Sequence, residues 1–305
     1  MDPSFPPPGR DFSARLHERI RDTGSRVCLG IDPRPETSPL THPERLGRDR
    51  QRVADAVADA YEGVLREASP YLACCKPQAA FFEALGPEGQ GALARVMAAA
   101  RELELPVILD AKRGDIGSTA EAYARAYLTD GPLSADALTV NPYAGLDTLE
   151  PFVEAAEAGG RGLFVLVKTS NPGGADLQDL RVEGGLSVHE VLAERLAARA
   201  DTLHAGEGGY TVLGAVVGAT HPETLTTLRR RMPRSVFLVP GVGAQGAGPD
   251  DVIGAFDEDG LGAVVSASRS LFDREARSVE ALARYAGEAA RRLASGIDDA
   301  LDRRA

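Results

Sequence analysis

Val107-Ile-Leu-Asp-Ala-Lys-Arg-Gly-Asp-Ile-Gly-Ser-Thr119 is the stretch of sequence that decides the fold of this chain. It opens with a short apolar run that predicts a buried strand, and a helical pattern follows it. The charged residues Asp110, Lys112 and Asp115 therefore lie where a strand gives way to a helix. Because residues two apart on a strand face the same side, we expect Asp110 and Lys112 to project together, with Asp115 on the turn beyond them.

The same alternation of apolar run and helical pattern occurs eight times along the chain. The runs cover residues 27–33, 71–77, 107–109, 137–142, 162–170, 212–220, 236–243 and 263–269. Near-continuous apolar strands between helices predict a parallel sheet that is covered on its outer face. Eight such units in 305 residues favour an α/β fold with a closed (β/α)8 (TIM) barrel in a single domain over an open sheet. In addition, no dinucleotide-binding glycine motif follows the first run.

The two ends of the chain differ from this pattern. Residues 1–11 are rich in proline and are expected to be disordered. The barrel is expected to span residues 12–296, with a last helix that ends near Ala294 and a charged tail over residues 297–305.

Composition narrows the classes of partner and compartment. A net charge of −11 argues against nucleic acid or an anionic membrane as the main partner. The three cysteines, Cys28, Cys74 and Cys75, lie in apolar runs and are odd in number, which favours a reducing cytoplasm over a disulfide framework. No apolar run approaches about 18 residues and no hydrophobic signal segment opens the chain, so we expect neither a membrane span nor export.

Lysine is rare in a chain that has 34 lysine and arginine residues together, and it stands only at positions 76, 112 and 168. Each of the three follows or ends an apolar run. Because arginine takes the other basic positions, a lysine that remains is expected to do what arginine does not, such as donate a proton from a compact amine. An ammonium flanked by carboxylates stays charged and is held in place, and one such pair at ~4 Å contributes roughly 4 kcal/mol before desolvation.

In a (β/α)8 barrel the active site lies at the carboxyl ends of the strands. The residues that the prediction places there are Asp32, Lys76, Asp110, Lys112, Asn141, Lys168, Ser170, Gly243 and Arg269. The glycine-rich turn at 240–246, with Gln245, and Arg269 after the eighth run predict a phosphate site. The long loop 171–185 is interpreted as a mobile lid. The simpler alternatives are a salt-bridged loop that caps a helix and a glycine-rich loop beside a surface arginine.

The segment Asp110-Ala-Lys-Arg-Gly-Asp-Ile-Gly-Ser-Thr119 resembles the D-x-K-x-x-D-I-x-x-T motif of orotidine 5′-phosphate decarboxylases. The resemblance extends over the whole barrel through four further motifs. These are Leu29-Gly-Ile-Asp-Pro-Arg-Pro35, Cys75-Lys-Pro-Gln78, Val167-Lys-Thr-Ser-Asn-Pro172 and Pro240-Gly-Val-Gly243, and they are similar to the longer, mycobacterial-type (type 2) branch of that family.

This resemblance implies a cofactor-free decarboxylation of orotidine 5′-monophosphate to UMP and CO2, the last step of UMP biosynthesis, with no metal. The catalytic residues it implies are Lys112, which protonates C6, with Asp110, Asp115 and Lys76 in an alternating charge network. The substrate-binding residues it implies are Asp32 at the ribose, Ser170 at the pyrimidine, and Gln245 and Arg269 at the phosphate, with Thr119 from the partner. It also implies a homodimer in which Asp115 and Thr119 reach into the partner's site.

Three other functions are compatible with parts of the sequence. Val167-Lys-Thr-Ser170 resembles the Schiff-base strand of deoxyribose-phosphate aldolase, which makes Lys168 the nucleophile of a class I aldolase. A magnesium-dependent sugar-phosphate decarboxylase on the same barrel is a second alternative, with Asp110 and Asp115 as metal ligands. A phosphosugar-binding barrel without catalytic activity is the third.

Overall fold

The computed structural model describes residues 11–206, 208–243 and 246–304. Its eight strands overlap the eight predicted runs: β1 (Val27–Ile31), β2 (Cys74–Pro77), β3 (Ile108–Arg113), β4 (Ala137–Val140), β5 (Gly162–Lys168), β6 (Leu213–Val217), β7 (Phe237–Pro240) and β8 (Ala263–Ala267). Strand β3 continues past the predicted end at Leu109 and includes Asp110 and Lys112. The strands pair in parallel in the order β2-β1-β8-β7-β6-β5-β4-β3. Two parallel bridges, Cys75 with Val107 and Gln78 with Asp110, join β2 to β3. The sheet therefore closes into the predicted (β/α)8 barrel.

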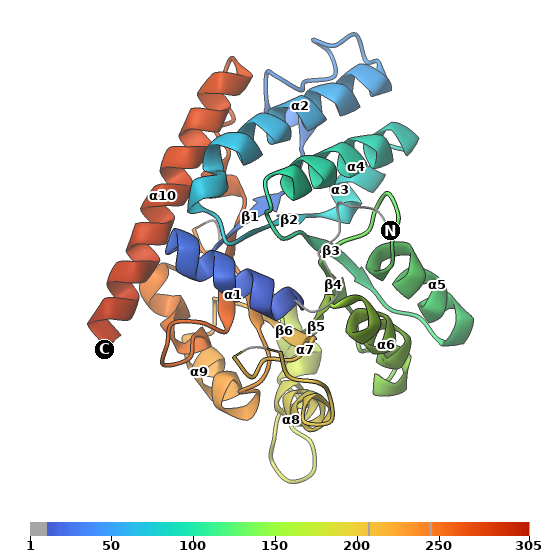
Figure 1. Ribbon diagram of the computed structural model, residues 1–305, viewed down its shortest axis with the longest axis vertical. Helices are drawn as coiled ribbons and strands as arrows, with labels where there is room; N and C mark the ends of the chain where they lie inside the picture. Colours follow the sequence, from blue (N-terminus) through green and yellow to red (C-terminus); the bar gives the residue numbers. More distant parts are fainter. Residues whose placement is uncertain (1–10, 207, 244–245, 305) are drawn as a thin grey trace.

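Helices alternate with the strands and surround the barrel (Figure 1). They are α1 (Phe12–Thr23), α2 (Arg50–Ala68), α3 (Ala79–Glu83), α4 (Pro87–Glu102), α5 (Gly117–Leu128), α6 (Glu150–Gly159), α7 (Ala175–Gln178), α8 (Val188–Ala200), α9 (Pro222–Arg231) and α10 (Val279–Arg304). A 3-10 segment, Pro249–Ala255, connects β7 to β8. The loop 171–185, predicted as a glycine-rich lid, contains α7, and its Arg181 forms a bridge with Ser187 just before α8.

The barrel interior is separate from the apolar layer beneath the outer helices. Successive strand residues face the two layers: Cys28 faces the interior, whereas Leu29 packs under the helices. Helix α1 contributes Phe12 to the interior cluster, where its ring meets that of Phe164 edge-on at 5.8 Å. A Cβ at Gly162, the first residue of β5, would lie 2.5 Å from the Phe12 ring, so the glycine lets α1 approach. Helix α1 thus covers the amino-terminal end of the barrel, and the opposite end remains for ligands (Figure 1).

The last helix is longer than the sequence pattern predicted, because α10 continues to Arg304 through the residues expected as a charged tail. Ile297 and Leu301 are buried and lie four residues apart, so they extend the apolar stripe of the helix. Arg303 pairs with Asp250 at 2.6 Å. The predicted disorder of the proline-rich start falls on residues 1–10, outside the described residues, while Asp11 accepts a hydrogen bond from the Ala14 amide and caps α1.

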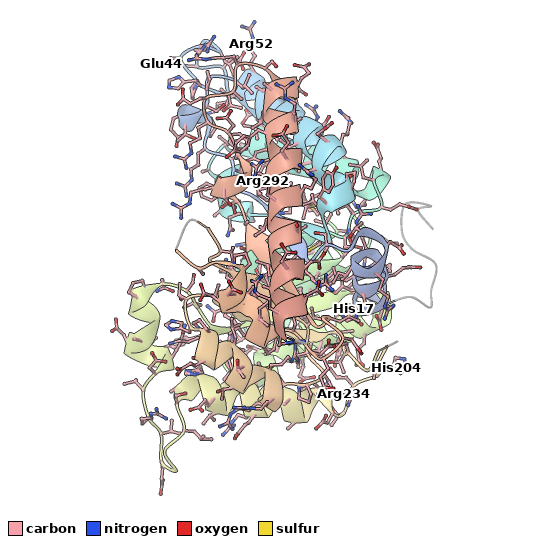
Figure 2. All side chains as sticks on the ribbon, turned by 90° about the vertical axis from the view of Figure 1, so that its left-hand side faces the viewer. His17, Glu44, Arg52, His204, Arg234 and Arg292 are labelled. Atoms are coloured by element: carbon pink, nitrogen blue, oxygen red, sulfur yellow. The ribbon has the colours of Figure 1, made fainter. Side chains whose placement is uncertain are left out.

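A buried histidine links α1 to the barrel. His17 is 1% exposed, and its ring lies 4.7 Å from that of Tyr210. Its Nε2 accepts a hydrogen bond from the Gly262 amide at 3.4 Å. Burial lowers the pKa of His17 to about 4, and the nearby Asp257 only partly opposes this effect. Figure 2 shows His17 on α1, on the side of the barrel opposite the segment that contains α7. The imidazole is therefore neutral in the folded protein near pH 7.

Protonation of His17 is expected to destabilise the fold in mild acid. Because the pKa is about 4 when folded and 6.5 when unfolded, the unfolded chain binds more protons between these pH values. The free energy of unfolding should fall across this window by about 3 kcal/mol from this group alone. Denaturant titrations of the wild type and His17→Gln between pH 7 and pH 4 measure it. Glutamine still offers an acceptor but does not titrate, so equal pH slopes would contradict the prediction.

Candidate functional site

The candidate site lies at the carboxyl-terminal ends of the strands. Asp32 follows β1, Lys76 lies on β2, and Asp110 and Lys112 lie on β3. The other predicted residues that the structure describes lie at the same end of the barrel: Asn141 after β4, Lys168 and Ser170 at and after β5, and Gly243 and Arg269 after β7 and β8. Gln245, predicted as a phosphate ligand, lies outside the described residues.

Asp110 is the centre of this site, and its two carboxylate oxygens accept four hydrogen bonds. Oδ2 accepts from Lys76 Nζ at 2.7 Å and from Gln78 Nε2 at 3.0 Å. Oδ1 accepts from Lys112 Nζ at 2.5 Å and from Thr139 Oγ1 at 2.9 Å. The predicted convergence of Lys76, Asp110 and Lys112 is therefore observed. Four donors, two of them charged, hold the carboxylate in one orientation.

Burial and charge act in opposite directions on this network. Burial by itself raises the pKa of Asp110, but the ammonium groups of Lys76 and Lys112 outweigh it and hold the pKa well below its usual range. Burial lowers the pKa of Lys76, whereas Asp110 and Asp32 raise it above the usual range. The side chains of Lys76 and Asp110 are 7% and 8% exposed, while that of Lys112 is 43% exposed. Lys112 is thus the member of the network that a ligand can reach.

Strand β3 is irregular in the part that contains Asp110 and Lys112. Leu109 pairs with Leu138 and Arg113 with Val140, so β3 has more residues than β4 between these pairs. Lys112 adopts a φ of 48°, in the left-handed region. This backbone conformation costs a non-glycine residue about 1–2 kcal/mol. Ile108 belongs to the interior cluster, whereas Leu109 and Ala111 pack under the helices, so the predicted alternation, which places Asp110 and Lys112 on the same side, is kept despite the bulge.

Thr139 and Gln78 are the site residues that sequence reasoning missed. Thr139 is fully buried, and its hydroxyl accepts the Lys112 amide proton at 2.9 Å while it donates to Asp110. One side chain therefore holds both the bulged backbone and the carboxylate. The signal for Thr139 was a polar residue within an otherwise apolar strand, and Gln78 stands beside Lys76 in a motif that was quoted for other reasons.

Asp115 and Thr119 are not joined to this network within one chain. Asp115 Oδ1 accepts a hydrogen bond from the Ile116 amide at 2.8 Å, and no ion pair of the described residues includes Asp115. Thr119 is exposed on the first turn of α5. Ile116, between them, is 65% exposed. This segment therefore presents both polar side chains and an apolar one outward.

A hollow between the ends of β1 and β8 contains two further predicted residues. Asp32 and Arg269 line it together with Gly30, Arg34, Thr37, Tyr61, Ser268, Phe272 and Arg274. A Cβ at Gly30 would lie 2.0 Å from Ser268 Oγ, so the glycine lets these two strand ends approach closely. Among the described residues, Asp32 Oδ1 is buried without a hydrogen-bond partner. A buried carboxylate oxygen without a partner, beside arginines, suits a ligand with hydroxyl and anionic groups.

Ser170 and Lys168, close in sequence, have different surroundings. Gly218 lets the end of β6 approach Ser170, because a Cβ there would lie 2.8 Å from Ser170 Cα. Lys168 instead forms an ion pair with Asp179 at 2.6 Å and does not join the Asp110 network. No group of three or more histidine, cysteine or acidic residues in the described part of the chain could hold a metal ion. None of the helices described is long and apolar enough to cross a membrane.

Known proteins resemble this chain over most of its length. Residues 25–285 match the model of the orotidine 5′-phosphate decarboxylase / HUMPS family. A protein of Rhodopirellula baltica named orotidine 5′-phosphate decarboxylase is 48% identical over 272 residues, covering 85% of this chain and 87% of that protein. One of Deinococcus radiodurans with the same name is 48% identical and covers 85% and 88%. The structure of Leishmania donovani OMP decarboxylase superposes with a TM-score of 0.75 at 35% identity, covering 96% of this chain and 99% of that one.

Removing the charge of Asp110 is expected to destabilise the fold strongly. Asp110→Asn leaves Lys76 buried without its counterion, which lowers the free energy of unfolding by about 3–5 kcal/mol. The pKa of Asp110 is lowered from 3.8 and that of Lys76 raised from 10.5, so the loss should be constant between these values. It should shrink as the pH falls below the first or rises above the second. Denaturant titrations from pH 3 to pH 11 measure this.

The control is Asp250→Asn, which breaks an ion pair with Arg303 of similar length, 2.6 Å, between side chains that are 77% and 60% exposed. Because solvent screens that pair, the free energy of unfolding of Asp250→Asn should equal that of the wild type within experimental error. Equal losses of stability in the two variants would contradict the prediction that burial makes the Asp110 ion pair matter more than an exposed one.

Proposed function

Because the chain belongs to the orotidine 5′-phosphate decarboxylase / HUMPS family, we propose that it converts orotidine 5′-monophosphate to UMP and CO2 at the Asp110 network. The observation that carries the assignment of the site is the position of Lys112. Its Nζ is held 2.5 Å from Asp110 Oδ1, and its side chain is nevertheless 43% exposed at the barrel mouth. An anchored ammonium that a ligand can reach is what this reaction requires.

Lys112 is the proton donor in this proposal. When CO2 leaves, the electron pair of the broken carbon–carbon bond stays at C6 of the pyrimidine, where no adjacent carbonyl delocalises it. The ammonium stabilises this charge as it develops and then transfers its proton to C6, which gives UMP. Asp110 keeps the ammonium aimed and remains ionised throughout, because its other oxygen is bound by Lys76.

The remaining predicted residues bind the substrate in this proposal. Asp32 with Lys76 binds the ribose, Ser170 contacts the pyrimidine, and Arg269 with Gln245 binds the phosphate. Two observations support these assignments. Asp32 and Arg269 line one hollow, and the charge of Asp32 raises the pKa of Lys76. A planar guanidinium matches phosphate oxygens with two parallel hydrogen bonds. Binding energy from the phosphate, distant from C6, can then serve orientation at the reacting carbon.

The active form in this proposal is a homodimer in which Asp115 and Thr119 complete the partner's site. Asp115 makes no ion pair among the residues described, and the neighbouring Ile116 is 65% exposed. A large exposed apolar side chain beside unused polar groups is typical of an interface.

We also propose that the chain belongs to the longer, mycobacterial-type (type 2) branch, on the motifs at residues 29–35, 75–78, 167–172 and 240–243. A cytoplasmic location is also proposed. It is supported by Cys28, Cys74 and Cys75, which are buried and unpaired, as expected in a reducing compartment.

The alternatives are less well supported. A class I aldolase needs Lys168 as a free amine, but its Nζ is engaged by Asp179 at 2.6 Å. The two relatives reported above that are 48% identical are named orotidine 5′-phosphate decarboxylase. Neither name supports an aldolase or a magnesium-dependent sugar-phosphate decarboxylase.

Lys112→Ala is expected to lower kcat for orotidine 5′-monophosphate by more than about 10³-fold, because both charge stabilisation and the proton are lost. Affinity for UMP, measured by calorimetry, should change only a few-fold. The absorbance change of orotidine 5′-monophosphate, followed with and without chelator, measures turnover. Lys112→Arg keeps the charge but not a proton that is readily given up, so it should be nearly as slow. Near-normal turnover by either variant would refute the proposed role.

Hybrid dimers test the shared site. Lys112→Ala and Asp115→Asn, each inactive alone, are coexpressed with different tags so that subunits pair at random. Half of the dimers are then hybrids, and one of the two sites in each hybrid has both wild-type residues, so about a quarter of the wild-type activity should return. If Asp115 acted in the site of its own chain, neither hybrid site would be intact and no activity would return.

A further inference from the structure

Lys168 is the one of the three lysines that the proposed reaction does not use. It ends β5, its side chain is 3% exposed, and its Nζ donates to Asp179 Oδ1 at 2.6 Å. Asp179 directly follows α7, and its side chain is 44% exposed. A buried cation on the barrel therefore pairs with an anion on the loop outside it. This bond also lowers the pKa of Asp179.

Two further hydrogen bonds join the same two segments. Gln178 Oε1 accepts from the Thr169 amide at 3.0 Å, and Gln178 Nε2 donates to Thr169 Oγ1 at 2.8 Å. A Cβ at Gly174 would lie 2.9 Å from both Thr169 Oγ1 and Gln178 Oε1, so the glycine permits this approach. Lys168 and Thr169 on one side, and Gln178 and Asp179 on the other, thus enclose residues 170–177. The first of these is Ser170, the proposed pyrimidine contact. Ser170 therefore directly follows Lys168 and Thr169, the two residues through which the loop is bonded to the barrel.

The segment buries few of its own side chains. Leu177 and Leu180 are 57% and 54% exposed, and of residues 171–180 only Gly174 is buried. Figure 2 shows this part of the chain projecting from the barrel on the side opposite α1. His189, at the start of α8, adds a polar contact, with Nδ1 2.8 Å from the Gln178 carbonyl oxygen and 3.2 Å from Asp179 Oδ1. A segment with few buried apolar contacts opens easily unless polar bonds hold it.

We propose that the Lys168–Asp179 ion pair is a latch that holds the segment 170–186 against the barrel mouth, so that Lys168 positions Ser170 for the substrate. The proposal rests on the proposed function for the role of Ser170, but the latch itself does not depend on it. Opening the latch leaves the Lys168 ammonium buried without its partner, which favours the closed state. A lysine suits this place because its compact ammonium fits a buried site that a larger guanidinium with five donors would not.

The first experiment measures opening without substrate. Arg181, whose side chain is 70% exposed, places a trypsin site inside the segment. Asp179→Asn should speed cleavage after Arg181 at least about tenfold, measured by mass spectrometry of the intact chain over time. The matched control is Asp176→Asn, which removes the same charge from the exposed face of α7 and should cleave at the wild-type rate. Circular dichroism of each variant checks that the barrel is folded.

The second experiment measures catalysis with orotidine 5′-monophosphate. Asp179→Asn should raise KM about tenfold or more and change kcat less, because binding to the open state must first close the segment. Asp179→Glu, which keeps the charge, should restore part of the loss. Lys168→Met should resemble Asp179→Asn, and the double variant should be no worse than either single one, because both remove the same bond.

The outcomes separate the latch from the proposed function. Cleavage at equal rates in Asp179→Asn and Asp176→Asn overturns the latch, whether or not the protein decarboxylates its substrate. If Asp179→Asn is cleaved faster but has an unchanged KM, the proposal that the latch positions Ser170 for the substrate is wrong. Additive losses in the double variant show that Lys168 and Asp179 act separately, which also overturns the latch. Absence of turnover in the wild type refutes the proposed function, and the cleavage rates still decide the latch.

Discussion

The carboxylate of Asp110 is a buried negative charge, and the candidate site depends on how that charge is compensated. Two ammonium groups and two neutral donors surround its oxygens. Without them the carboxylate would be protonated or the fold would not close around it. The same bonds fix Lys112, so the interactions that make the burial of Asp110 tolerable also aim the exposed ammonium. Stability and chemistry therefore depend on the same set of atoms.

The two ends of the barrel serve different purposes. At the amino-terminal end, α1 places Phe12 in the interior and keeps His17 neutral in a buried position. At the carboxyl-terminal end, the charged residues Lys76, Asp110, Lys112 and Lys168 lie in the last parts of the strands. Each of these charged residues lies on or directly after a strand, and neighbouring strands fix the register of that strand. The charged end of the barrel is therefore rigid.

Lys112 and Lys168 show how burial assigns different roles to similar ion pairs. Their Nζ atoms lie 2.5 and 2.6 Å from a carboxylate oxygen, but their side chains are 43% and 3% exposed. For Lys112 the carboxylate is the buried partner, so the ammonium faces the mouth. For Lys168 the ammonium is the buried partner and the carboxylate lies on a loop. The first arrangement offers a cation to a ligand, and the second ties a loop to the barrel.

The sequence by itself determined the barrel and the edge at which the site lies. Eight apolar runs, each followed by charged, polar or glycine residues, suffice because the carboxyl ends of parallel strands meet at one end of a barrel. Only the tertiary structure showed that Thr139 and Gln78 bind Asp110, that β3 shifts its register between Leu109 and Arg113, and that Asp179 pairs with Lys168. These contacts join segments far apart in the chain or depend on a local change of register. Neither strand register nor loop closure is encoded in the periodicity of a single segment, because both arise from the packing of one element against another.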